Sequence, residues 1–429
     1  MRKLAELLSD LASGALDARL TGIYGCGKAE LQVQRDRLGG LVAAYGEAFG
    51  TDGEAGLFSG PGRTEMGGNH TDHQHGRVLA AAINLDAVAC AGPNGTDEIH
   101  ILSAGYPDIV LNADDCAIRA AEKETSAALV RGIAARFVEL GYHVGGFNAC
   151  VESTVLGGSG LSSSAAYEVL IGVIINHLFC EDQVSLVQIA QIGQYAENVY
   201  FGKPCGLMDQ LASAVGSIVS IDFKNPAEPM VNRLDYDLTA SGYLMCIVDS
   251  GADHADLTGE YAAIPQEMGA VAACFGKKVL RDVDYHDFWD RLGEVREKTG
   301  DRAVLRAMHF FQDNLLALKQ AQALENDDFH AFLKIVDESG RSSAMLLQNL
   351  YCVSQPQAQA MNVTRALARH FLDGDGAVRV HGGGFAGTVQ VYVPADKKEA
   401  FRTGMEAVLG KGSCHFFNIR PEGGAIIAG

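Results

Sequence analysis

Glycine and serine residues gather near position 160 in a pattern that could hold a phosphate group. The stretch GGSGLSSSAA covers residues 157–166 and directly precedes an apolar, helix-like run that ends at Phe179. At the start of a helix, several backbone N–H groups lack intrahelical partners and the helix dipole is positive, so an anion is stabilised there. The candidate residues for binding a phosphate chain are Gly158, Ser159, Gly160, Leu161, Ser162, Ser163 and Ser164.

This stretch is not a Walker loop, because the pattern GxxxxGK[ST] is absent. Glycine allows close approach of an anion to the backbone, while serine hydroxyls can cap the helix, donate to the anion or bind magnesium. A serine-rich helix cap without any ligand is the alternative interpretation.

A second cluster, PGRTEMGGNHTDHQHG at residues 61–76, places one arginine, histidines and an aspartate among glycines. An arginine can stabilise charge on a transferring phosphoryl group, and aspartate with histidine can hold sugar hydroxyls by hydrogen bonds. The string HTDHQH could instead bind a metal such as zinc. We favour hydroxyl binding, since phosphoryl transfer uses magnesium, which prefers oxygen ligands to imidazoles.

These clusters need a scaffold of helices and strands, and the hydrophobic pattern predicts one. Residues 1–50 and 125–141 have helical spacing, 77–91 is strand-like, and the run 164–179 is apolar nearly all round, as in a buried helix. A chain of 429 residues exceeds one ordinary core. The polar, proline-containing stretch 222–235 predicts a boundary near residue 226, with domains at 1–225 and 226–429.

Composition excludes some classes of function. The formal charge of −19 argues against nucleic-acid partners, which require clustered Lys and Arg. The ten cysteines are scattered without a CxxC pair, so we expect reduced thiols. The sequence has no uninterrupted apolar segment of about 18 residues and no apolar signal-peptide core at its start. We therefore expect a cytoplasmic protein without a membrane partner.

With a third cluster, HGGGFAGTVQVYV at residues 381–393, the glycine-rich motifs resemble, in order, those of the galactokinase, homoserine kinase, mevalonate kinase and phosphomevalonate kinase (GHMP) superfamily. The first motif, GRTEMGGNHTDHQHG, is similar to the galactokinase signature GRxNxIGEHTDYNxG, and RPEGGA at residues 420–425 resembles its carboxy-terminal RPSDGA. The resemblance implies a two-domain α+β fold with the active site in the interdomain cleft. It also implies ATP-dependent phosphorylation of the anomeric hydroxyl of a sugar.

By this resemblance, Asp209 in AENVYFGKPCGLMDQLAS is the catalytic carboxylate beside the anomeric hydroxyl, and Arg63 is the cation near the γ-phosphate. A carboxylate and a guanidinium suffice for a reaction that depends mostly on positioning and charge stabilisation. We expect Asp209 also to cap a helix beginning at Gln210. Glu197 and Ser164 are implied to hold Mg²⁺. The implied sugar contacts are Asn69, His70, Asp72, Gly206 and Tyr261.

Departures from the signature include Glu65 in place of Asn, Asn69 in place of Glu, and His73 in place of Tyr. If Glu65 and Asn69 face each other, a hydrogen bond between them survives the exchange and galactose remains the substrate. Alternatively, the amide at position 69 removes a like charge and admits a uronic acid. We predict D-galactose as the substrate, with galacturonate or L-arabinose as alternatives and a non-catalytic galactose and ATP sensor as a third.

Overall fold

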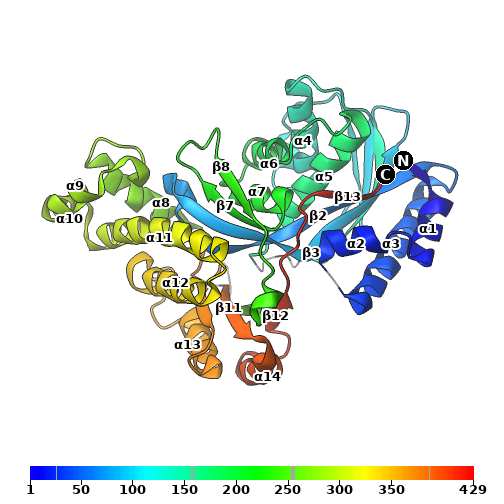
Figure 1. Ribbon diagram of the computed structural model, residues 1–429. Coiled ribbons are helices and arrows are strands. Elements are labelled where there is room, and N and C mark those ends of the chain that lie inside the picture. Colours follow the sequence, from blue (N-terminus) through cyan, green and yellow to red (C-terminus); the bar gives the residue numbers. More distant parts are fainter. Residues whose placement is uncertain (26, 156, 158–159, 253–256, 386) are drawn as a thin grey trace.

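The computed structural model describes residues 1–429 except 26, 156, 158–159, 253–256 and 386, and it mixes two sheets with surrounding helices (Figure 1). The α-helices are α1 (Leu4–Ser13), α2 (Asp17–Tyr24), α3 (Lys28–Phe49), α4 (Ser126–Glu139), α5 (Ser163–Phe179), α6 (Leu186–Tyr195), α7 (Met208–Val215), α8 (Thr258–Ala273), α9 (Tyr285–Asp290), α10 (Leu292–Thr299), α11 (Asp301–Glu325), α12 (Phe329–Ser342), α13 (Ala360–Leu372) and α14 (Lys398–Leu409). The predicted helices in 1–50, 125–141 and 164–179 and the predicted strand at 77–91 are confirmed.

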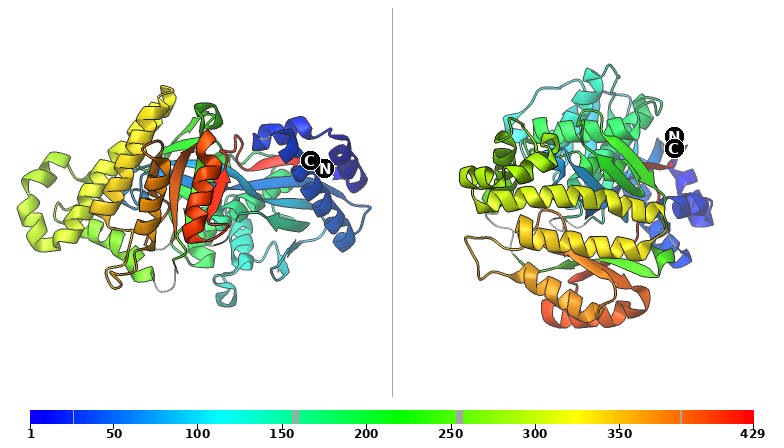
Figure 2. Two further views of the ribbon diagram at one scale, coloured as in Figure 1. Left: turned by 90° about the horizontal axis from the view of Figure 1, so that it is seen from below. Right: turned by 60° about the vertical axis from the view of Figure 1, so that its left-hand side comes forward.

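The larger sheet has the strand order β1-β2-β3-β6-β4-β5, with β13 added to β2 and with β7 pairing both β3 and β8. Its strands are β1 (Arg2–Lys3), β2 (Glu54–Gly67), β3 (Arg77–Pro93), β4 (Glu98–Ser103), β5 (Ile109–Asn112), β6 (Phe147–Ser153), β7 (Ile218–Asp222), β8 (Met230–Leu234) and β13 (Ala425–Ala428). The first strand, β1, and the last strand, β13, both pair with β2, so the two ends of the chain are neighbours (Figures 1 and 2).

The smaller sheet has the antiparallel order β10-β11-β9-β12, formed by β10 (Ala377–Val380), β11 (Thr388–Pro394), β9 (Tyr243–Asp249) and β12 (Cys414–Phe417). Helices α12 and α13 pack against this sheet, and the long helix α11 lies beside α12 and also contacts β3 of the larger sheet (Figure 2). The division into domains at 225/226 stays a prediction. Two segments after residue 226, the strands β8 and β13, belong to the larger sheet.

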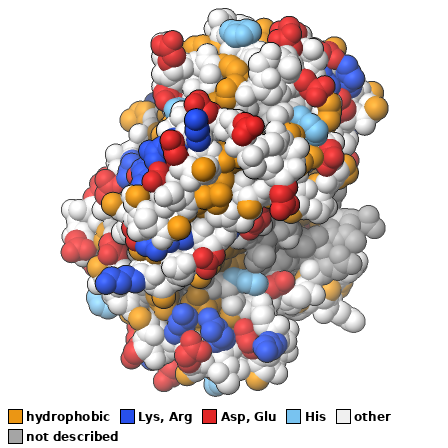
Figure 3. All heavy atoms as spheres, turned by 90° about the vertical axis from the view of Figure 1, so that its right-hand side faces the viewer, with side chains coloured by type: hydrophobic (Ala, Val, Ile, Leu, Met, Phe, Trp, Pro, Cys, Tyr) orange, Lys and Arg blue, Asp and Glu red, His pale blue; other side chains and the backbone are white. Residues whose placement is uncertain are grey.

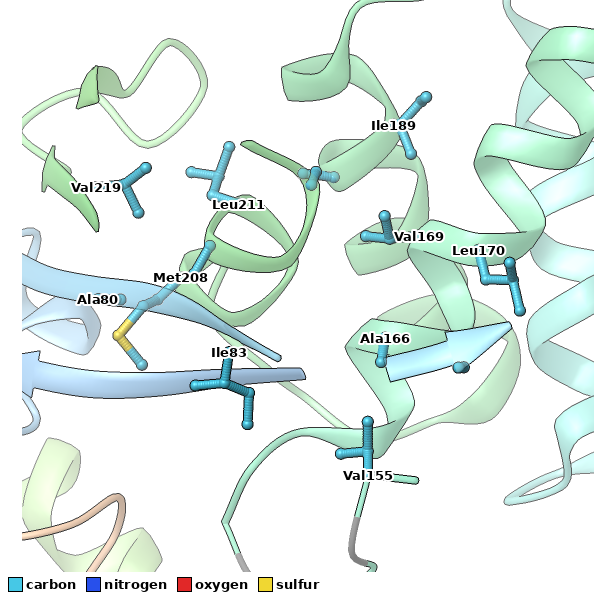
Figure 4. Packing of buried hydrophobic residues seen from close by; sticks show 14 of the residues in the cluster. Ala80, Ile83, Val155, Ala166, Val169, Leu170, Ile189, Met208, Leu211 and Val219 are labelled. Atoms are coloured by element: carbon cyan, nitrogen blue, oxygen red, sulfur yellow. The ribbon is translucent and has the colours of Figure 1, made fainter. Parts of the chain in front are cut away.

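Helix α5 is the central support of the first motif. It is buried on nearly every side, as its apolar sequence predicts, and Figure 4 shows Ala166, Val169 and Leu170 within the packed core. The helix lies so close to β2 that a Cβ added at Gly60 would meet the Ala166 carbonyl oxygen at 2.3 Å. Only glycine fits that approach, which fixes the phosphate-loop end of α5 against the strand that carries Arg63.

Helix α7 is held by the same core. Figure 4 shows Met208 beside Ala80 and Ile83 of β3 and Leu211 on the side of Val219 of β7, while Ile189 of α6 lies on the side of α5. All of these side chains except Met208 are fully or almost fully buried, and Met208 retains 8% exposure. Helices α5 and α7 contact each other and both contact strand β2, so these three elements are packed as one unit.

The surface is mixed in character. Figure 3 shows one face, on which acidic, basic and apolar side chains are interspersed. Within the described part of the chain, no helix combines the length and the apolar character needed to cross a membrane.

Candidate active site

Arg63 and Asp209 form a forked ion pair at the centre of the site. Arg63 Nε donates to Asp209 Oδ1 at 2.7 Å, and the Arg63 NH2 group donates to Oδ2 at 2.6 Å. Strand β2 has a bulge between Pro61 and Arg63, and bulges of this kind redirect the side chains that follow them. The structure therefore brings together the two residues that the sequence assigned to chemistry, although 146 positions separate them.

Asp209 lies inside helix α7 and does not cap it, so that prediction is wrong. The helix begins at Met208, with Leu207 at the capping position. Being in the first turn, the carboxylate still lies at the positive end of the helix dipole. The Asp209 side chain is 31% exposed, compared with 8% for Arg63, so the carboxylate has an open side that a substrate can reach.

The electrostatics keep Asp209 ionised. Burial alone would raise the pKa of this carboxyl group, but the charge and hydrogen bonds of Arg63, with a further bond from Ser162, hold the pKa below its ordinary value. Asp209 is therefore a carboxylate at neutral pH and accepts hydrogen bonds there.

The phosphate-loop candidates lie directly against this pair. The Arg63 backbone N–H donates to the Leu161 carbonyl at 3.0 Å, and the Arg63 guanidinium also donates to the Gly160 carbonyl. The Ser162 hydroxyl donates to Asp209 instead of capping α5, and Ser162 adopts φ 56°, a left-handed conformation that is uncommon outside glycine. Gly158 and Ser159 lie outside the described residues.

Ser164 and Glu197 lie together near the start of α5. Their side chains approach to 3.4 Å between Ser164 Oγ and Glu197 Oε1. Glu197 belongs to a π-helical turn, η3 (Ala196–Phe201), and its side chain is 4% exposed. A hydroxyl and a buried carboxylate are oxygen donors of the kind that Mg²⁺ prefers, so this pair suits that ion.

The sequence argument missed three residues around Glu197. Gln210 Nε2 bridges two carboxylates, donating to Glu197 Oε2 at 3.0 Å and to Glu168 Oε2 at 2.9 Å. Lys203 Nζ lies 3.3 Å from Glu197 Oε1. Burial, together with the charge of Glu197, holds the pKa of Glu168 well above its ordinary value. One available signal was helical spacing, because Glu168 follows Ser164 by four residues.

The residues predicted to contact the sugar come from the first glycine cluster, from the segment before α7 and from α8, with His70 and Tyr261 contacting backbone carbonyls of the third cluster. A Cβ at Gly206 would lie 2.4 Å from Asp72 Oδ2, so these two residues are immediate neighbours. His70 Nε2 is 2.9 Å from the Gly383 carbonyl oxygen, and the Tyr261 hydroxyl donates to the Gly384 carbonyl at 2.9 Å. Burial lowers the pKa of His70 to about 4, so the imidazole is neutral at physiological pH.

Glu65 and Asn69 face each other, as the exchange of amide and carboxylate suggested. Asn69 Nδ2 donates to Glu65 Oε1 at 3.1 Å, and Glu65 also accepts from Arg379 at 2.6 Å. Asn69 is fully buried, and its role as a sugar contact stays a prediction. Its side chain has three further hydrogen-bond partners within the protein, which are Gly382, Ser343 and Asn349.

The histidines of the first motif do not form a metal site. His70 and His73 are neighbours, with ring centroids 5.9 Å apart. Among the described residues, however, no group of three His, Cys, Asp or Glu side chains is placed to hold a metal ion.

A cavity of about 630 Å³ opens beside the loop. Its lining joins Ser163 and Ser164 of α5 to the end of β4, the segment before β5 and the start of α4. This volume is in the range of small-molecule and cofactor sites. The sequence could not predict this cavity, because the apolar residues of a cavity wall follow no characteristic sequence motif.

Comparison with known proteins agrees with this geometry. A family model described as "GHMP kinases N terminal domain" matches residues 128–217, and one described as "Galactokinase galactose-binding signature" matches residues 43–93. The galactokinase of Streptomyces coelicolor is 30% identical over 89% of this chain and 96% of its own length. That of Glaesserella parasuis is 32% identical over 83% of this chain and 90% of its own length.

This chain belongs to the galactokinase family. The protein is therefore an ATP-dependent sugar kinase of the GHMP superfamily, and the predicted fold class is confirmed. The structure of Lactococcus lactis galactokinase complexed with galactose superposes with a TM-score of 0.77 at 23% identity, covering 91% of this chain and 99% of that one. A mevalonate kinase structure has a TM-score of 0.57 at 14% identity over 86% of this chain and 99% of its own, which is a likeness of fold.

Proposed function

We propose that this protein transfers the γ-phosphate of ATP to the anomeric hydroxyl of D-galactose, giving galactose 1-phosphate. The observation that carries the proposal is the forked Arg63–Asp209 pair, which contacts the predicted phosphate-loop residues Gly160 and Ser162 and leaves the Asp209 carboxylate partly exposed. The galactokinase names of the relatives and the match to the galactose-binding signature support galactose as the acceptor.

Asp209 acts as the acceptor of the hydroxyl proton in this reaction. Its open side takes a hydrogen bond from the anomeric hydroxyl, and the proton moves to the carboxylate as the sugar oxygen forms its bond to the γ-phosphorus and ADP leaves. Arg63 has two effects. Its fork orients Asp209, and its remaining NH1 group lies at the Gly160 carbonyl, where the guanidinium charge stabilises negative charge on the transferring group.

Ser164 and Glu197 would hold Mg²⁺, since they supply oxygen donors within 3.4 Å of each other. The ion would neutralise charge on the phosphates of ATP. Gln210 keeps the buried Glu197 carboxylate in place by its hydrogen bond to Oε2, which leaves Oε1 toward Ser164.

ATP would occupy the 630 Å³ cavity and the adjoining loop. The phosphate chain would run along the predicted set, Gly158, Ser159, Gly160, Leu161, Ser162, Ser163 and Ser164, at the positive end of α5. The nucleoside would fill the part of the cavity between β4 and α4.

A neutral sugar suits the Glu65 region better than a uronic acid does. Arg379 is fully buried and paired with Glu65, so its charge is already matched and is not offered to a substrate carboxylate. The sugar hydroxyls would be bound by the neutral groups of His70, Gly206 and Tyr261. The Asp72 carboxylate would accept hydrogen bonds from them as well. A cytoplasmic location and the lack of nucleic-acid partners stay predictions.

The test is ADP release from ATP with the purified protein and a panel of galactose, galacturonate and L-arabinose. We expect kcat/KM for galactose to exceed the other two values by at least about tenfold, the scale of one or two selective polar contacts. A higher value for galacturonate would assign the protein to uronic acids. Binding of ATP and galactose without turnover would identify a sensor.

A further inference from the structure

Glu168 is a fully buried carboxyl group for which the proposed reaction has no use. It lies in α5, about one helical turn after Ser164. Glu168 Oε2 accepts a hydrogen bond from Gln210 Nε2 at 2.9 Å, whereas Oε1 has no hydrogen-bond partner among the described residues. Burial of a carboxyl group with an unpaired oxygen costs free energy, so a contribution to stability does not account for this residue.

Gln210 connects Glu168 to the predicted metal ligand Glu197. Its Nε2 group donates to Glu168 Oε2 and also to Glu197 Oε2, the latter at 3.0 Å. Both neighbours accept hydrogen bonds, so only the NH2 side of the amide fits between them, and the bond to Glu168 fixes the amide for Glu197. Gly193 of α6 leaves room for the contact, because a Cβ there would meet Glu168 Oε2 at 3.0 Å and Gln210 Cγ at 3.4 Å.

The link matters because Glu197 is held from two sides. Lys203 Nζ lies 3.3 Å from Glu197 Oε1, the same oxygen that lies 3.4 Å from Ser164 Oγ. The Lys203 side chain is exposed, so its charge draws Oε1 toward the surface and away from α5. The bond from Gln210 to Oε2 opposes this attraction from the buried side. If Glu168 no longer fixes Gln210, the Glu197 carboxylate can turn toward Lys203 and leave its place beside Ser164.

We propose that Glu168 is a positioning residue for the metal ion bound with ATP: by fixing the Gln210 amide, it keeps Glu197 Oε1 beside Ser164. It touches neither the ion nor the reacting atoms. This inference rests on the proposed function only in taking Ser164 and Glu197 as the residues that hold Mg²⁺. The identity of the sugar does not enter it.

The first experiment measures by calorimetry how much magnesium tightens nucleotide binding in the absence of sugar. The probe is an ATP analogue with a CH2 group between its β- and γ-phosphorus atoms, and its Kd is measured with magnesium and with a chelator. Glu168→Met keeps the length of the side chain and removes the hydrogen bond. We expect the ratio of the metal-free Kd to the magnesium Kd to fall about three- to tenfold, the scale of one neutral hydrogen bond. The metal-free Kd should not change.

Two variants are the matched controls. Burial and the charge of Glu197 raise the pKa of Glu168, so the carboxyl group is neutral, and in Glu168→Gln an amide oxygen can accept the same bond. This variant should keep the parent ratio. Asn176→Leu, about two turns further along α5, removes buried hydrogen bonds to the Val184 backbone and should keep the ratio as well. An equal fall in either control would overturn the inference.

A double variant tests whether the effect passes through Gln210. Gln210→Met removes the group that orients Glu197, and it should lower the ratio by at least about tenfold, the scale for loss of a partner that orients a metal ligand. Adding Glu168→Met should lower it no further, because the two residues act in series. Additive losses would overturn the inference, and so would a parent-like ratio in Glu168→Met alone.

Glu168→Asp keeps the test decisive if Glu168→Met fails to fold. The shorter side chain stays polar but ends one CH2 group short of Gln210, so we expect the same fall in the ratio. Failure of the proposed metal site shows separately. A parent that binds the analogue equally with and without magnesium overturns that site and the inference together, whereas a magnesium effect that the Glu168 variants retain overturns the inference alone. A parent that phosphorylates no sugar leaves the comparison of dissociation constants intact.

Discussion

Two arginine–carboxylate pairs each include one residue of β2, Arg63 in the first and Glu65 in the second, and they differ in their exposure to solvent. The Arg63–Asp209 pair has an open side, with the Asp209 side chain 31% exposed. The Arg379–Glu65 pair is closed, with side-chain exposures of 0% and 6%, and Asn69 adds a further hydrogen bond to Glu65. The open pair can exchange protein contacts for substrate contacts. The closed pair has its two charges matched within the protein, although Arg379 Nε has no hydrogen-bond partner among the described residues.

This difference separates chemistry from architecture. A buried ion pair contributes little net stability over an apolar substitute, but loss of one partner leaves an uncompensated charge and costs about 3–5 kcal/mol. A partly exposed pair costs less to break, because water can solvate the remaining charge. The same kind of substitution should therefore act on stability at Glu65 and on catalysis at Asp209.

Glu65→Gln is expected to have the largest effect, and the effect should be on stability. The change removes the charge that matches the fully buried Arg379, so the free energy of unfolding should fall by about 3–5 kcal/mol. Denaturant unfolding measures it. Asp235→Asn, in the exposed pair with Arg233, is the control and should cost at most about 1 kcal/mol. A loss at Glu65 no larger than that control would contradict the closed-pair interpretation.

Asp209→Asn is expected to lower kcat by at least about a hundredfold, the usual scale for loss of a general base. Calorimetry should find ATP binding nearly unchanged, because the carboxylate faces the sugar side. The free energy of unfolding should fall less than in Glu65→Gln. If turnover stays within tenfold of the parent, Asp209 does not take the proton.

Arg63→Lys is expected to lower kcat at least about tenfold, although it keeps the charge. A lysine ammonium cannot reproduce the fork that binds both Asp209 oxygens and the Gly160 carbonyl together. Steady-state kinetics with saturating ATP and galactose measures the loss. Parent-like turnover would show that a point charge suffices and that the forked geometry is incidental.

Much of this arrangement could be predicted from the sequence because it depends on short sequence motifs. The glycine-serine run before an apolar helix predicts a phosphate loop, and the family resemblance pointed to Arg63 and Asp209, which the structure brings together. What remained unpredicted depends on contacts between distant segments. Lys203 and Gln210 are examples, because only the folded chain brings their side chains to Glu197.

Pairings between strands that are distant in the sequence were also out of reach. The polar stretch after Asp222 looks like a linker, yet part of it forms β8 and pairs with β7. Strand β13, at the end of the chain, pairs with β2, and no local sequence pattern predicts this pairing. Asn69 was predicted as a sugar contact from its motif position alone. Its full burial and its partners on η6 (Ser343–Leu347) and in the following segment come from tertiary packing.

The smallest expected effect is that of pH on kcat/KM of the unmodified protein. Asp209 must be ionised to accept the proton, and its pKa lies below the ordinary value, so activity is lost only when the pH falls through that lowered pKa. His70, with a pKa of about 4, stays neutral over the same range. With saturating ATP and magnesium, kcat/KM for galactose should therefore show no limb from either group between about pH 5.5 and 8.

Arg63→Met sharpens this last prediction, because it removes the group that opposes the effect of burial. Burial then raises the pKa of Asp209 with only the Ser162 hydrogen bond and the Lys203 charge opposing it, and the acid limb of the residual kcat/KM should move to higher pH. Glu65→Gln is the matched control, since it breaks the closed pair and leaves the Arg63 fork in place. An acid limb that stays unmoved in Arg63→Met, or that moves equally in Glu65→Gln, would show that Arg63 does not set the charge state of Asp209.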